Sequence, residues 1–81
     1  MYEIEFVKGV LEDMDSLEKE TRERVFAVLE RIRIDPFRHA KKLSGSDAFR
    51  IRVGDFRIVF TIELKKIIIY AVEHRKKVYK F

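Results

Sequence analysis

Apolar and polar residues alternate at the start of the chain and again in its second half. Residues 2–6 set apolar side chains against two glutamates, which is the pattern of a half-buried strand. Residues 49–53 and 56–62 alternate in the same way and are separated by Gly54-Asp55. A two-residue loop with glycine first is typical of a type II′ turn, so these residues are predicted to form a hairpin.

Between the first strand and this hairpin, the apolar positions change to helical spacing. The first helical stripe consists of Val7, Val10, Leu11, Met14 and Leu17, and the second, over residues 20–34, consists of Val25, Val28, Leu29 and Ile32. Asp35-Pro36 ends the second helix, because the residue before a proline is disfavoured in the α region. The stripes predict two helices that pack on one face of a sheet.

Residues 67–73 are apolar on both faces and predict a central strand, whereas residues 37–48 are expected to form a connection. The order β-α-α-β-β-β predicts an α+β fold. We expect a small antiparallel or mixed four-stranded sheet with the N-terminal helical pair on one face. A chain of 81 residues supports one thin core, so residues 1–81 are expected to form a single domain.

Charge is segregated along the chain. Residues 1–35 carry 10 acidic and 6 basic side chains, whereas residues 36–81 carry 4 acidic and 12 basic ones. The basic second half predicts a surface for a polyanion or an acidic partner. The chain has no Asn or Gln and is rich in Lys, Glu and Arg, a composition typical of adaptation to high temperature.

Several classes of protein are excluded by composition. Without cysteine the chain has no disulfide and no thiolate metal site, and its two distant histidines predict no other metal site. The longest apolar run, residues 67–72, is far shorter than the roughly 20 residues of a membrane span. The N-terminus lacks the pattern of a signal peptide, so a cytoplasmic location is expected.

The two-residue loop fixes the register of the hairpin. It places Arg52 opposite Arg57, and it puts these two residues and Arg50 on the face opposite the apolar side chains. We call this side of the sheet the arginine face. Like charges that face each other destabilise a sheet, so the cluster indicates either full solvation or a bound anion. Three planar guanidinium groups favour the anion, because they suit bidentate phosphate binding.

The C-terminal segment is basic and aromatic. It contains Arg75, Lys76, Lys77 and Tyr79, and Lys41-Lys42 adds two cations in the preceding connection. Cations beside an aromatic ring are typical of single-stranded nucleic-acid binding. Alternatively, the apolar residues of the segment serve only to anchor the C-terminus.

Five segments together resemble a known family. They are Tyr2-Glu3-Ile4-Glu5-Phe6, Asp35-Pro36, Lys42-Leu43-Ser44-Gly45, the hairpin over residues 49–60, and the closing segment over residues 74–79. In this order and spacing they resemble the RelE/ParE toxin superfamily. The RelE branch implies a metal-independent endoribonuclease that needs no cofactor and cuts mRNA in the ribosomal A site. The ribose 2′-OH attacks the adjacent phosphate, and the products carry a 2′,3′-cyclic phosphate and a 5′-OH.

The resemblance also implies a role for each matching residue. Arg50 and Arg52 match the basic pair of the family's second strand, and Arg57 matches the arginine that grips the phosphate. Arg75 matches the arginine at the leaving group, and Tyr79 matches the aromatic residue that stacks on or activates the substrate. The lysines Lys41, Lys42, Lys76 and Lys77 are expected to contact RNA.

The chain departs from the family where its mRNA-cutting members often carry Lys, Glu or His, because it has Arg50 and Arg52 there. Arginine is not deprotonated in proteins, so either Tyr79 or His74 is expected to act as the general base. Alternatively, much of the acceleration comes from stabilisation of the phosphorane charge by three or four arginines. Two alternatives stay open: a ParE-like toxin that binds DNA gyrase without catalysis, and an inactive binding module.

The resemblance further implies a RelB-like antitoxin as partner. We expect an acidic, amphipathic segment of that antitoxin to cover the arginine face. The predicted register places Val59, Tyr70 and Val72 there, so the partner would bury apolar area as well as match charge.

Overall fold

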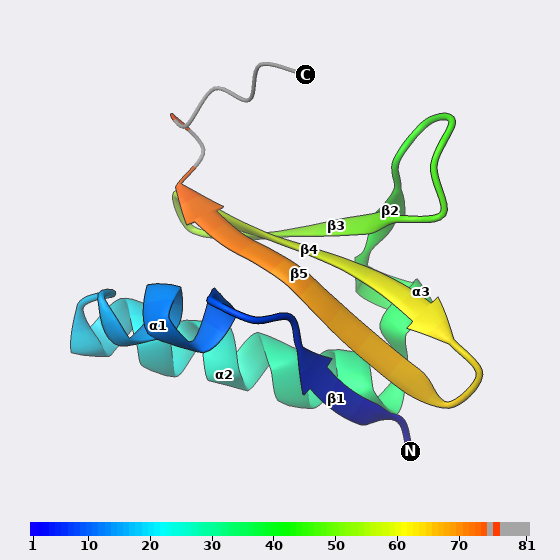
Figure 1. Ribbon diagram of the computed structural model, residues 1–81, viewed down its shortest axis with the longest axis horizontal. Helices are drawn as coiled ribbons and strands as arrows, with labels where there is room; N and C mark the ends of the chain where they lie inside the picture. The colour runs from blue at the N-terminus through cyan, green and yellow to red at the C-terminus, as the bar shows by residue number, and fades with distance from the viewer. Residues whose placement is uncertain (75, 77–81) are drawn as a thin grey trace.

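The structure is a computed structural model that describes residues 1–74 and 76. Its elements, in chain order, are β1 (Glu3–Phe6), α1 (Val10–Asp15), α2 (Lys19–Ile34), α3 (Pro36–His39), β2 (Lys41–Lys42), β3 (Phe49–Val53), β4 (Phe56–Glu63) and β5 (Lys66–His74). The strands form one mixed sheet in the order β1-β5-β4-β3-β2. Both α1 and α2 lie on the same side of it (Figure 1).

The predicted α+β architecture is confirmed, with five strands instead of four. Strand β1 pairs with β5 in parallel, and all other neighbours are antiparallel. The additional strand β2 spans only two residues, which pair with Phe49 and Arg50. Two consecutive lysines carry no apolar alternation, so the sequence pattern could not reveal this strand. Strand β5 lies between β1 and β4, as its apolar character predicted.

The core lies between the helices and one face of the sheet. All four residues of the second predicted stripe are buried, and they pack with residues of the three central strands. Helix α1 is shorter than the predicted stripe: Val10 and Met14 are buried, but Val7 precedes the helix and Leu11 is half exposed. Helix α2 ends at Ile34, immediately before Asp35-Pro36, as predicted.

The register of the β3–β4 hairpin is the predicted one, residue for residue, from the pair Val53–Phe56 to the pair Phe49–Phe60. Gly54 has a φ of +59°, whereas Asp55 does not have a positive φ. That combination is the one required by a type II′ turn.

The β4–β5 hairpin contains a β-bulge that the sequence analysis did not predict. Val59 pairs with Ala71 and Phe60 pairs with Ile69, so Tyr70 is an extra residue on β5. Because of the bulge, residues 71–74 of β5 lie on the opposite face from the one that strict alternation along the strand would give them. Val72 is therefore buried in the core, and its predicted position on the arginine face is wrong.

Candidate nucleic-acid interface

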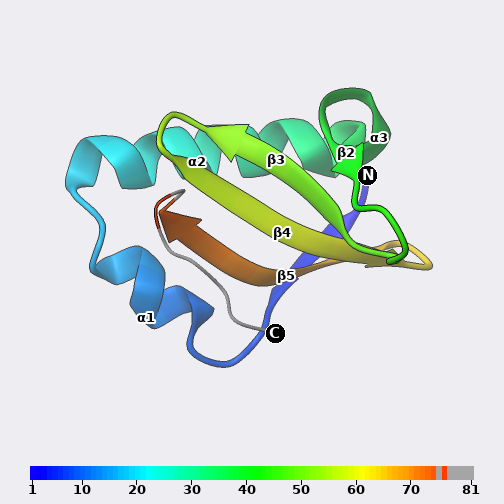
Figure 2. The same cartoon turned by 90° about the horizontal axis from the view of Figure 1, so that it is seen from above.

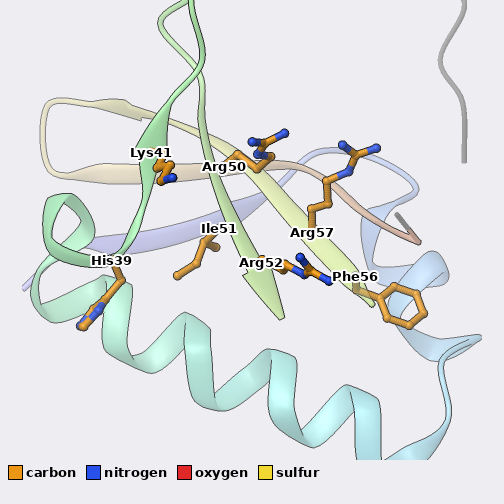
Figure 3. Close-up of a pocket in the computed structure, with 7 residues that line it drawn as sticks. All are labelled: His39, Lys41, Arg50, Ile51, Arg52, Phe56 and Arg57. Carbon is orange, nitrogen blue, oxygen red and sulfur yellow. The ribbon is translucent and has the colours of Figure 1, made fainter. Parts of the chain in front are cut away.

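The arginine face is the side of the sheet that α1 and α2 leave uncovered (Figure 2). Arg50 and Arg52 extend from β3 and Arg57 extends from β4. Figure 3 shows the side chains of Arg50 and Arg57 pointing away from the helix layer. Arg52 turns toward the end of its strand, where its Nε donates a hydrogen bond to the carbonyl of Gly54 at 3.0 Å.

Arg57 is balanced by a carboxylate that the sequence analysis missed. Three residues form one row across the sheet, because Arg52 pairs with Arg57 and Arg57 pairs with Glu73. The Glu73 side chain is only 8% exposed, and its Oε1 lies 3.6 Å from Nε of Arg57. Repulsion between the two arginines is thus offset within the protein, in addition to the solvent or anion that we had expected to relieve it.

This ion pair also orients the Arg57 guanidinium. Within the described residues, Nε of Arg57 is buried and makes no hydrogen bond, and the Glu73 carboxylate lies on its inner side. The terminal nitrogens lie at the outer end of the side chain, on the open face (Figure 3). A guanidinium held by its Nε edge leaves its other donors available for an oxyanion.

A second row crosses the sheet next to the first. Lys41 pairs with Arg50, Arg50 with Val59, and Val59 with Ala71. The short strand β2 therefore brings Lys41 to the arginine face. Lys42 is paired with Phe49 and belongs to the opposite face, so only one of the two predicted lysines joins the cluster.

The cationic side chains line a hollow along the outer edge of β3, with a cavity volume of about 460 Å³. Its lining residues are His39, Lys41, Arg50, Ile51, Arg52, Phe56 and Arg57 (Figure 3). None of them carries a negative charge, so the hollow favours an anion.

The predicted residues of the C-terminal segment are mostly beyond the structural description. Arg75, Lys77 and Tyr79 lie outside the described residues, and Lys76 is exposed. His74 pairs with Phe56 on the helix side of the sheet, and its Nδ1 accepts a hydrogen bond of 3.1 Å from the backbone N–H of Lys76. His74 therefore faces away from the arginine face.

The described part of the chain contains neither a metal-binding group nor a membrane-spanning helix. Within residues 1–74 and 76, no group of His, Asp and Glu could hold a metal ion. Over the same residues, no helix has the length and apolar character needed to cross a membrane.

The sheet face that α1 and α2 leave uncovered thus carries a cluster of four cations, Lys41, Arg50, Arg52 and Arg57, and its charge suits an anion. Residues 4–79 match the family described as ParE toxin of type II toxin-antitoxin system, parDE. The chain therefore belongs to the ParE/RelE toxin family and is a toxin of a type II toxin–antitoxin system. No curated protein sequence matches the chain.

Solved structures share the fold. The isolated RelE toxin of E. coli is 23% identical, with a TM-score of 0.84 over 96% of this chain and 88% of that one. The archaeal RelE–RelB complex of Pyrococcus horikoshii OT3 contains a chain that is 22% identical, with a TM-score of 0.78 over 95% of this chain and 98% of that one. A chain of the RelB–RelE complex of Methanococcus jannaschii is 28% identical, with a TM-score of 0.73 over 88% of this chain and 89% of that one.

Proposed function

We propose that this toxin is a ribosome-dependent endoribonuclease that cleaves mRNA in the A site. The observation that carries the proposal is the pair of guanidinium groups of Arg50 and Arg57, which point away from the helix layer and line the hollow along the outer edge of β3. When a ribose 2′-OH attacks the adjacent phosphate, negative charge develops on the phosphoryl oxygens. Cations that are already aimed at those oxygens lower the barrier, and in this proposal Arg57, paired with Glu73, is one of them.

The proton transfers are assigned to the C-terminal segment. Arginine cannot accept the 2′-OH proton, and His74 faces the helix side of the sheet. We therefore propose Tyr79 as the group that accepts this proton or stacks on the substrate, and Arg75 as the cation at the leaving oxygen. Arg52 contributes charge at the end of the cluster.

An antitoxin is the proposed protein partner. The solved complexes with the same fold contain RelB chains, and the arginine face of this chain is open and cationic. We propose that an acidic segment of the antitoxin covers Arg50, Arg57 and Lys41 and so keeps the toxin inactive. Co-expression with the small protein encoded beside it tests this. A chain that is harmless alone and retains no such partner on purification contradicts it.

Cleavage is tested by primer extension on an mRNA that is being translated in a purified system. The expected result is a set of new ends within codons, which appear only when ribosomes are present. The downstream fragment should accept phosphate from polynucleotide kinase without prior phosphatase treatment, because its 5′ end is a hydroxyl. Intact mRNA in the presence of folded toxin would contradict the proposal.

The second candidate is inhibition of DNA gyrase, and the match to the ParE family description favours it. A supercoiling assay with purified gyrase distinguishes the two functions. Inhibition of supercoiling together with intact mRNA would assign the toxin to the gyrase-binding branch, whereas cleavage with normal supercoiling would exclude that branch.

A further inference from the structure

A second hollow opens on the arginine face, on the β5 side of Arg50 and Arg57. Its cavity volume is about 370 Å³. Apart from the two arginines and Glu73, the hollow is lined by Leu43, Val59, Tyr70 and Ala71. It is thus mainly apolar, whereas the hollow along β3 is mainly cationic.

The β-bulge creates this hollow. Strict alternation along β5 would put Tyr70 and Ala71 on opposite faces, but the extra residue leaves both on the arginine face, between the buried Ile69 and Val72. Ala71 is small and leaves space above the sheet. The Tyr70 side chain beside it is 47% exposed, although the ring is large and mostly apolar.

Arg50 and Arg57 line both hollows, so an apolar space directly adjoins the two cations. A ligand that fills both must combine an anion with a flat, weakly polar group. A nucleotide has this combination, because its phosphate is joined through a sugar to an aromatic base. Bases stack on exposed tyrosine rings in many single-strand binding proteins.

We propose that the apolar hollow is a nucleobase subsite, in which a base of single-stranded RNA stacks on Tyr70 while its adjoining phosphate binds Arg50 and Arg57. This proposal rests on the proposed function, because it takes RNA as the ligand. It assigns the contact to Tyr70, which is not among the proposed catalytic residues. Stacking does not require the Tyr70 hydroxyl, so a phenylalanine ring would serve as well.

The test measures binding of the purified chain to two short RNAs by fluorescence anisotropy at low salt. Both RNAs are 2′-O-methylated and cannot be cleaved, and one of them has a single abasic position. The wild-type chain should bind the complete RNA about tenfold more tightly than the abasic one, as is typical for loss of one stacked base. Tyr70→Ala should abolish this difference, and Tyr70→Phe should retain it.

Phe26→Ala is the matched control, because Phe26 is 46% exposed but lies on α2, on the other side of the sheet. It should bind both RNAs as the wild type does, and thermal unfolding checks that every variant is folded. Equal affinity of the wild type for the two RNAs would overturn the proposal. So would a folded Tyr70→Ala variant that still binds the complete RNA more tightly than the abasic one.

These outcomes are separate from those of the cleavage assay. A wild-type toxin that cleaves mRNA but binds the complete and the abasic RNA with equal affinity keeps the proposed function and loses the subsite. A toxin that distinguishes the two RNAs through Tyr70 but cleaves no mRNA keeps the subsite and loses the endoribonuclease assignment.

Discussion

At the scale of single residues, the unusual feature is a buried carboxylate beneath a cluster of cations. Glu73 lies in the same row as Arg52 and Arg57, so its negative charge offsets the repulsion between them. The same charge fixes the Nε edge of Arg57. Stability and the proposed phosphate binding therefore involve the same ion pair, and substitutions at its two ends should have different consequences.

Arg57→Lys should lower the rate of mRNA cleavage by roughly 10²–10³, the usual cost of losing one preorganised donor to a developing oxyanion. The lysine keeps a positive charge for Glu73 but has no planar fork, so the fold should be preserved. Arg57→Ala should be equally inactive and also less stable, because it leaves the buried Glu73 carboxylate without this charge.

The comparison uses single-turnover primer extension together with thermal unfolding of each variant. Lys19→Ala is the control, since it removes one positive charge from an exposed position at the start of α2. Its cleavage rate should equal that of the wild type. Full activity of Arg57→Lys would show that a point charge suffices and that the guanidinium geometry has no role.

Glu73→Gln should lower the free energy of unfolding by roughly 1–3 kcal/mol, because an amide of the same shape removes the charge that faces Arg57. The exposed control Glu63→Gln should change it by less than about 0.5 kcal/mol. Urea denaturation at two salt concentrations measures both. The deficit of Glu73→Gln should shrink at high salt, because salt screens the repulsion between Arg52 and Arg57. Equal effects of the two substitutions would mean that the ion pair does not stabilise the fold.

At the scale of elements, the two hairpins differ in how much the sequence could reveal. The β3–β4 register was predicted completely, because a glycine-first loop of two residues joins strands that alternate clearly. In β5, residues 67–72 are all apolar, so the pattern contains no information about which side chains face the core. The predicted register placed Val72 on the arginine face, whereas the bulge puts Glu73 there, opposite Arg57.

The candidate site was likewise predictable only in part. Arg50, Arg52 and Arg57 were placed on the correct face, because they alternate with apolar residues in a hairpin of known register. Glu73 and the hollow beside Tyr70 depend on the bulge, and a bulge arises from tertiary packing of the strand. Neither could be predicted from local pattern.

Deletion of Tyr70 tests whether the bulge can be removed from the β4–β5 hairpin while the pairs on both sides of it are kept. Without this residue, Ile69 and Ala71 would become neighbours and keep their present partners Phe60 and Val59, so every core residue stays in the core. We expect the shortened chain to fold with a free energy of unfolding within about 1 kcal/mol of the wild type, as for an exposed position. Deletion of Ile68 is the contrasting variant. It would shift the pairing of part of β5 by one residue and turn the apolar side chains of that part toward the opposite face. The deletion should therefore unfold the chain.

Circular dichroism and urea denaturation distinguish these outcomes. If both deletions unfold the chain, Tyr70 is required for the pairing of β5. If both are tolerated, the register of β5 is not fixed by the core.

At the scale of the whole molecule, the segregation of charge along the chain becomes a segregation between layers. The acidic first 35 residues form α1, α2 and the edge strand β1, and the basic remainder forms the short helix α3 and strands β2 to β5 (Figure 1). The net charge of +4 therefore understates the potential of the arginine face. An RNA or an acidic antitoxin approaching that face meets cations that are concentrated on one side of the molecule.

This arrangement predicts how RNA binding should depend on salt. For single strands, the logarithm of the binding constant falls with the logarithm of salt concentration, with a slope of about −0.7 for each phosphate neutralised. Arg50→Ala should make the slope of the wild-type chain shallower by about 0.7, because Arg50 lines both hollows of the arginine face. Lys19→Ala removes the same charge from the helix layer and should leave the slope unchanged. Anisotropy titrations with a uridine oligonucleotide at several salt concentrations measure both. Equal changes in slope for the two variants would mean that RNA responds to the net charge of the molecule, and the assignment of the arginine face as the binding surface would then be wrong.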